Sequence, residues 1–118
     1  MNTPKPRILL VENIHPIAKD TLEKEGYAVD LLAHAPSEDE LIKLLPDYCA
    51  LGIRSKTEIT KKVLDTAAGI TTIGCFCIGT NQVDLVAAKS HGIAVFNAPH
   101  SNTRSVAELV IAEMIVLS

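Results

Sequence analysis

Large aromatic side chains are scarce in this sequence, which has no tryptophan and only two tyrosines and two phenylalanines. Yet 47% of its 118 residues are hydrophobic, which is enough for one domain with a real core. That core must therefore consist of leucine, isoleucine, valine and alanine side chains. Aliphatic cores of this kind are typical of helices packed on sheets, so the composition favours an α/β fold.

Positive charge, cysteine and long apolar runs are also limited. The formal net charge is -3 and no basic stripe is present, which argues against a nucleic-acid partner. The three cysteines are an odd number and include Cys75 and Cys77, one residue apart. This spacing predicts reduced thiols, and no histidine or cysteine cluster follows that could complete a metal site. The apolar run at 8–11 is too short for a signal peptide or a membrane span, so we expect a cytoplasmic protein without a membrane partner.

Apolar runs and turn residues predict a regular alternation of strands and helices. Strands are expected at 8–11, 28–32, 50–53 and 93–96 and within 70–78; helices are expected at 16–25, after a capping box of Ser37 and Glu40, after Thr60, and after Asp84. Pro46 should end the second helix. Parallel neighbours need such crossover connections, so we predict a flavodoxin-like five-stranded parallel sheet with helices on both faces.

The carboxyl-terminal residues follow another pattern. Ser105 and Glu108 form a second capping box, and the segment 106–117 is almost wholly aliphatic. A helix of this composition needs burial on every side, which the rest of the chain cannot provide. We therefore expect one domain over residues 1–100 and, over 101–118, the start of a helix that leads to another domain.

Ligands of open parallel sheets bind beyond the carboxyl ends of the strands. Arg54 follows the third predicted strand with a rigid fork of donors, and Ser55 adds a hydroxyl. Gly79 follows the fourth strand, where a glycine allows close approach to backbone amides. These residues predict a pocket for a small anion. No G-x-G-x-x-G, P-loop lysine or G-x-S-x-G motif is present, so no dinucleotide fingerprint is expected here.

Other interpretations remain open at this point. Arg54 could be a solvated surface residue, and the cysteines could be small buried side chains. A signalling receiver domain has the same sheet, but it needs an aspartate after strand three and an acidic pair after strand one. This sequence has Arg54 and Glu12-Asn13 there. A separate small-molecule binding domain is the third possibility.

Three segments resemble a known family: LGIRSKT at 51–57, IGCFCIGTNQVD at 73–84 and FNAPHSNTRSVAEL at 96–109. From about Arg7 onward the chain is similar to the D-2-hydroxyacid dehydrogenases, and its CFCIGTN segment resembles the bacterial type that acts on phosphoglycerate. The resemblance implies a homo-oligomeric two-domain enzyme of serine biosynthesis that converts 3-phosphoglycerate to 3-phosphohydroxypyruvate with NAD. Another 2-hydroxy acid is the alternative substrate.

The resemblance also implies roles for individual residues. Arg54 and Ser55 would face the substrate, the backbone of Cys77, Ile78 and Gly79 would receive its carboxylate, Asn102 would line the cleft, and Ile78 and Val106 would touch the nicotinamide. The family's catalytic arginine, glutamate and histidine lie in the nucleotide domain, so no catalytic residue is expected here. We therefore expect this chain alone to be inactive.

Overall fold

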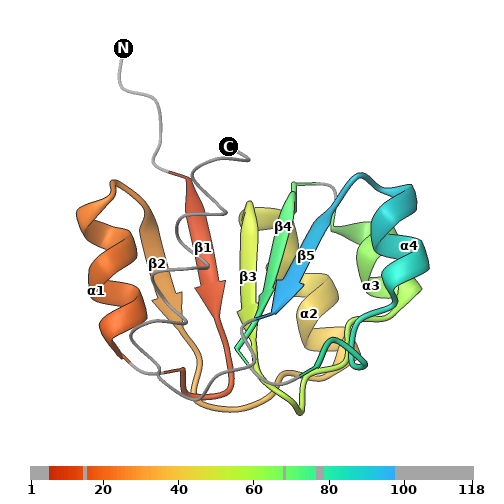
Figure 1. Ribbon diagram of the computed structural model, residues 1–118, viewed down its shortest axis with the longest axis horizontal. Coiled ribbons are helices and arrows are strands. Elements are labelled where there is room, and N and C mark those ends of the chain that lie inside the picture. The colour runs from red at the N-terminus through yellow and green to blue at the C-terminus, as the bar shows by residue number, and fades with distance from the viewer. Residues whose placement is uncertain (1–5, 15, 68, 77–78, 98–118) are drawn as a thin grey trace.

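The computed structural model describes residues 6–14, 16–67, 69–76 and 79–97, and in this part five strands alternate with helices (Figure 1). The elements are β1 (Arg7–Leu10), α1 (Pro16–Lys24), β2 (Ala28–Leu31), α2 (Glu38–Leu44), a 3-10 turn (Leu45–Asp47), β3 (Ala50–Ile53), α3 (Lys61–Thr66), β4 (Thr72–Cys75), α4 (Leu85–Ser90) and β5 (Ala94–Asn97). The predicted order of strands and helices is confirmed over this part.

The five strands form one parallel sheet in the order β2-β1-β3-β4-β5. The chain first adds β2 on one side of β1 and then crosses to the other side for β3, β4 and β5. This order is the flavodoxin-like one, so the predicted fold is confirmed. All five arrowheads point to the same edge in Figure 1, and the loops that leave β1, β3 and β4 therefore meet there.

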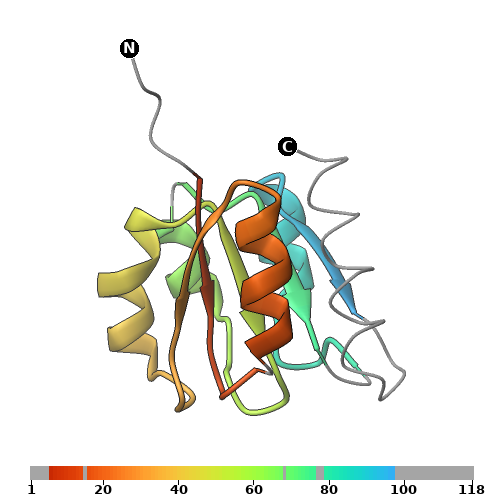
Figure 2. The ribbon, with the colours of Figure 1, turned by 90° about the vertical axis from the view of Figure 1, so that its left-hand side faces the viewer.

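Each face of the sheet has its own aliphatic core. Ile8 and Leu10 of β1 pack with α1, whereas Leu9 and Val11 pack with α2, α3 and α4. Alternate residues of a strand point to opposite faces, so a continuous apolar run supplies both cores. Figure 2 shows α1 and α2 on opposite sides of the sheet.

Gly52 lets the α1 face pack tightly around β3. A Cβ atom at this position would lie 2.5 Å from Leu10 Cδ2 and 3.1 Å from Phe76 Cε1. Both neighbours belong to the core under α1, and Phe76 directly follows β4. A glycine is therefore needed here for space rather than for an unusual backbone angle.

The predicted helix starts are confirmed by their hydrogen bonds. The Ser37 hydroxyl accepts from the Glu40 N–H at 3.2 Å, and the Glu40 carboxylate accepts from the Ser37 N–H at 3.4 Å, which completes the capping box. Thr60 and Asp84 cap α3 and α4 through the amides of Val63 and Ala87. These side chains fix where each helix leaves its preceding loop.

Some boundaries differ from the prediction. α2 ends at Leu44, but the chain then makes the 3-10 turn, which includes Pro46. Proline fits there because the first turn of a helix needs no N–H donor. β4 occupies only Thr72–Cys75 of the predicted 70–78 stretch. The second capping box, the helix at 106–117 and the division near residue 100 lie outside the described residues. Among the helices that are described, none has the length and hydrophobicity to cross a bilayer.

Candidate functional site

The loops that follow β3 and β4 are bonded to each other at the carboxyl edge of the sheet. Ile59 and Val83 form a parallel bridge, and the Ile59 N–H donates to the Gln82 carbonyl at 2.8 Å. The side-chain nitrogen of Gln82 also donates to the Arg54 carbonyl at 2.8 Å. The loop that carries Arg54 and Ser55 therefore lies beside the loop that begins at Gly79, as the parallel-sheet argument predicts.

A buried carboxylate organises the turn after β3. Glu12, which is 8% exposed, accepts three backbone N–H groups with both of its carboxylate oxygens. Oε2 accepts from Arg54 at 2.6 Å and from Thr57 at 3.1 Å, and Oε1 accepts from Lys56 at 2.8 Å. This role of Glu12 was not predicted from the sequence. Its position directly after a predicted strand, at the same edge as Arg54, was the available signal.

The backbone at Glu12 is held in an uncommon conformation. Glu12 and Asn13 have φ angles of 63° and 55°, in the left-handed region that residues with a side chain rarely occupy. Their N–H groups donate to the carbonyls of His34 and Leu32, each at 3.1 Å. Each such residue costs about 1 to 3 kcal/mol, which the surrounding hydrogen bonds must offset. This turn directs the Glu12 carboxylate toward the loop after β3.

The hydrogen bonds also decide the charge of Glu12. Burial alone would raise its pKa, but the Thr57 hydroxyl and the amides of Lys56, Arg54 and Thr57 favour the charged form, and the net pKa is lowered. The Thr57 hydroxyl makes no hydrogen bond of good geometry, although it is buried, so we attribute the lowering mainly to the three amides. Glu12 is therefore a carboxylate rather than a neutral acid at neutral pH.

Acid should weaken the domain partly through Glu12. Because its pKa is lower in the folded state than its ordinary value of 4.5, its contribution to stability is fully present above that pH and is lost as the pH falls through the folded-state pKa. We expect the free energy of unfolding, measured with urea, to fall less steeply below that pH in Glu12→Gln than in the unmodified chain. Equal slopes in the two proteins would contradict this prediction.

Several donors of the turn after β3 remain free to bind a ligand. Arg54, Ser55 and Lys56 are exposed. Over the described ranges, their side chains and the Ser55 N–H have no hydrogen-bond or ion-pair partner. A guanidinium, an ammonium and a hydroxyl on consecutive residues form a compact set of donors for an anion. Lys56 belongs to this set, although it was not among the site residues predicted from the sequence.

The β4 side of the site is only partly described. A Cβ atom at Gly79 would lie 3.9 Å from Asn81 Nδ2, an ordinary contact, so the described neighbours do not by themselves require glycine. Cys77, Ile78, Asn102 and Val106 lie outside the described residues, so their suggested roles stay predictions.

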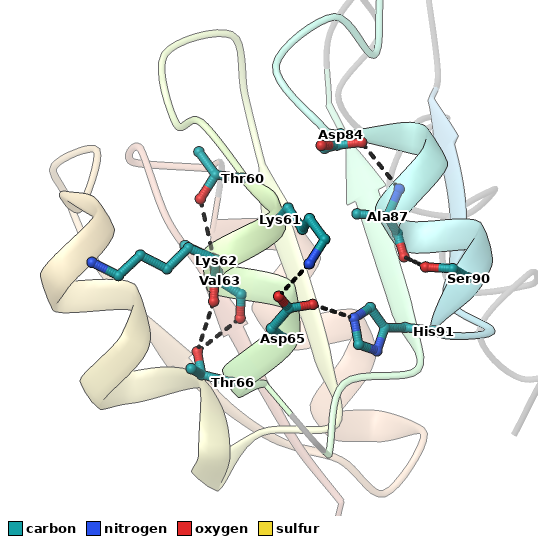
Figure 3. Close-up of polar contacts among 10 residues, drawn as sticks. All are labelled: Thr60, Lys61, Lys62, Val63, Asp65, Thr66, Asp84, Ala87, Ser90 and His91. Carbon is teal, nitrogen blue, oxygen red and sulfur yellow. Dashed lines mark hydrogen bonds and ion pairs between the residues drawn. The ribbon is translucent and has the colours of Figure 1, made fainter.

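A polar network joins the two helices that follow these loops (Figure 3). Asp65 of α3 accepts from Lys61 Nζ at 2.7 Å and lies 2.7 Å from His91 Nε2 at the end of α4. Hydrogen bonds from Lys61, which has the larger effect, and from His91 lower the pKa of Asp65. Exposed pairs of this kind stabilise a fold only slightly. Because Asp65 contacts His91, we interpret the network as a link between α3 and the end of α4. The nearby Ser90 hydroxyl takes no part in it, since it donates within α4 to the Ala87 carbonyl at 2.9 Å.

The receiver-domain alternative does not fit the described site. The position after β3 that would carry a phosphorylated aspartate holds Arg54. Glu12, which follows β1 where a receiver domain would carry an acidic pair, is directed at the turn after β3 and accepts three of its backbone amides. Among the described residues, no group of three or more histidine, cysteine, aspartate or glutamate side chains could hold a metal ion. The donors at this edge suit an anion instead.

Curated relatives match nearly the whole chain. D-3-phosphoglycerate dehydrogenase 1 of Saccharomyces cerevisiae is 55% identical over 112 residues, which cover 95% of this chain and 24% of the relative. The D-3-phosphoglycerate dehydrogenase of Escherichia coli (strain K12) is 48% identical over 114 residues, 96% of this chain and 28% of the relative. The chain thus spans about a quarter of the length of these relatives. The similarity also extends beyond bacterial enzymes.

Solved structures share the fold. The TT0316 protein of Thermus thermophilus has a TM-score of 0.74 at 29% identity, over 93% of this chain and 36% of that one. The NAD+-bound 3-phosphoglycerate dehydrogenase of Entamoeba histolytica has a TM-score of 0.74 at 24% identity, over 95% and 39%. The family model described as "D-isomer specific 2-hydroxyacid dehydrogenase, catalytic domain" matches residues 8–114. The chain therefore belongs to the D-isomer-specific 2-hydroxyacid dehydrogenase family and matches its catalytic domain.

Proposed function

We propose that this chain forms the substrate-binding side of an NAD-dependent dehydrogenase that converts 3-phosphoglycerate to 3-phosphohydroxypyruvate in serine biosynthesis. The observation that carries the proposal is the exposed turn of Arg54, Ser55 and Lys56, whose side-chain donors and Ser55 N–H have no partner in the described part of the chain. The D-3-phosphoglycerate dehydrogenases at 48% and 55% identity support this choice of substrate.

The substrate carries a phosphate and a carboxylate, and the two sheet loops offer a donor set for each. The fork of Arg54 and the ammonium of Lys56 suit one anionic group, and the Ser55 hydroxyl and N–H can orient it. The backbone of Cys77, Ile78 and Gly79 would receive the carboxylate. Asn102 would line the cleft. In this arrangement the chain binds and orients the acid.

NAD, when bound, accepts the hydride from the carbon that bears the substrate hydroxyl. The sequence contains no glycine-rich dinucleotide fingerprint, so its residues fit one wall of such a cleft rather than the main cofactor site. Ile78 and Val106 would contact the nicotinamide side. Most cofactor contacts, and the catalytic residues, would come from another domain. Assembly as a homo-oligomer and a cytoplasmic location stay predictions.

Titration of the 15N-labelled chain with 3-phosphoglycerate tests the proposal. The backbone NMR signals of Ser55 and Gly79 are expected to shift in a saturable way, because their amides lie on the two loops that would hold the acid. D-lactate, a 2-hydroxy acid without phosphate, should bind more weakly, and the chain with NAD should show no turnover. Shifts that sulfate reproduces equally would indicate a nonspecific anion site. Absence of shifts at both loops would contradict the proposed substrate, and tighter binding of D-lactate would favour a different 2-hydroxy acid.

A further inference from the structure

We infer that Glu12 is a positioning residue for the substrate: it does not touch the acid, but it fixes the main chain from which Arg54 and Ser55 reach it. This inference rests on the proposed function, because it explains how the turn that would bind the substrate keeps its conformation. It concerns a residue that lies 42 positions before Arg54 in the sequence and enters the site from the end of β1.

Three backbone amides of the turn after β3 are directed at Glu12. The N–H groups of Arg54, Lys56 and Thr57 converge on one carboxylate, at 2.6, 2.8 and 3.1 Å. The Ser55 N–H does not take part, and in the described structure it has no acceptor at all. Glu12 thus occupies the other three donors and leaves the Ser55 amide for a ligand. An anion at this turn would meet side chains and one N–H rather than a ring of amides.

The main chain of Arg54 is held from two sides. Glu12 accepts its N–H, and the Gln82 side chain donates to its carbonyl at 2.8 Å. Gln82 belongs to the loop after β4, so the exits of three neighbouring strands, β1, β3 and β4, meet at this residue. With its main chain fixed on both sides, the long Arg54 side chain begins from one defined point. A fixed main chain matters because a displacement of a binding group by about 1 Å can lower the reaction rate by about a hundredfold.

A carboxylate of this length is what satisfies the three amides of the turn. Both oxygens of Glu12 accept N–H donors. In glutamine an NH2 group would replace one of the two oxygens, so that a donor would face a backbone N–H donor. Aspartate is one methylene shorter, so its carboxylate would lie farther from the amides. A carboxylate also makes stronger hydrogen bonds than a neutral amide oxygen. The left-handed backbone at Glu12 brings the group into reach, which gives that uncommon conformation a purpose.

The test compares Glu12→Gln with Glu58→Gln in the 118-residue chain. Glu58 is an exposed carboxylate of the same loop that makes no hydrogen bond or ion pair with a described residue, so its substitution removes the same charge without breaking the amide bonds. Hydrogen exchange of the Arg54, Lys56 and Thr57 amides should become about tenfold faster or more in Glu12→Gln. The dissociation constant for 3-phosphoglycerate, measured by NMR below the unfolding transition, should rise roughly threefold to tenfold. Glu58→Gln should change neither quantity.

The outcomes separate the two proposals. If the unmodified chain does not bind 3-phosphoglycerate, the proposed function fails. If it binds, but Glu12→Gln exchanges faster with unchanged affinity, Glu12 is only a structural residue and the inference is overturned. Unchanged exchange would overturn it as well. Should Glu12→Gln not fold, Glu12→Asp keeps the charge and is expected to move both readouts in the same direction, and unchanged readouts in that variant would count against the inference.

Discussion

In a complete dehydrogenase that carries this domain, Arg54→Ala is expected to lower kcat/KM for 3-phosphoglycerate by about 10- to 150-fold, which corresponds to about 1.5–3 kcal/mol for one charge-assisted contact. Arg54 is exposed and has no carboxylate partner among the described residues, so its loss should leave the fold intact. Most of the effect should appear in KM, with a further decrease in kcat if the guanidinium also orients the acid. Steady-state kinetics with each substrate varied measures both.

Two further variants show whether the effect is specific. Arg7→Ala removes an arginine at the amino end of β1, the end of the sheet opposite to Arg54, where Arg7 pairs with Asp30 at 2.7 Å. This substitution should change kcat/KM by less than about twofold. Arg54→Lys keeps the charge without the planar fork and should recover only part of the activity. Equal losses in Arg54→Ala and Arg7→Ala would mean that net charge, rather than a contact at Arg54, controls the reaction.

Leu51→Ala should cause the largest loss of stability, about 3–5 kcal/mol in the free energy of unfolding. Leu51 is fully buried in the central strand β3 and is aligned between Leu9 of β1 and Ile73 of β4. Its removal leaves a cavity in the core under α2, α3 and α4, which the paired strands cannot easily close. Domains of this size are stable by about 5–15 kcal/mol, so this loss is a large part of the stability of the whole fold.

Leu31→Ala is the matched control for that experiment. The substitution removes the same atoms as Leu51→Ala, but Leu31 lies on the edge strand β2 and is 43% exposed. Its substitution should cost less than about 1 kcal/mol, because much of the side chain remains in water in the folded state. Urea unfolding followed by circular dichroism gives both values. Similar losses in the two variants would contradict the assignment of Leu51 to the centre of the core.

The fold was predictable because its determinants are local in sequence. Apolar runs of about four residues mark the strands, and Ser37, Thr60 and Asp84 mark helix starts by side-chain hydrogen bonds that span three residues. Parallel pairing then places Arg54 and Gly79 on neighbouring loops, and the Ile59–Val83 bridge bears this out. Each of these inferences needs only a short window of sequence and one rule of sheet topology.

The contacts that sequence reasoning missed join distant residues. The Glu12 hydrogen bonds span 42 to 45 positions, and the bond between Asp65 and His91 spans 26. No local pattern marks a carboxylate as the acceptor of a distant loop, because the pairing depends on the left-handed turn at Glu12 and on the register of β1 with β3. Lys56 was overlooked for a related reason: whether a surface cation is paired can be seen only in three dimensions.

The close packing at Gly52 constrains any redesign of this domain. Phe76 lies against that position and is also the residue from which the chain leaves β4 toward Cys77. A larger side chain at residue 52 would collide with Leu10, which would have to be shortened in compensation, and it would press on the Phe76 ring at the start of the loop after β4. Attempts to alter substrate preference through that loop and attempts to stabilise the interior under α1 would therefore have to be planned together.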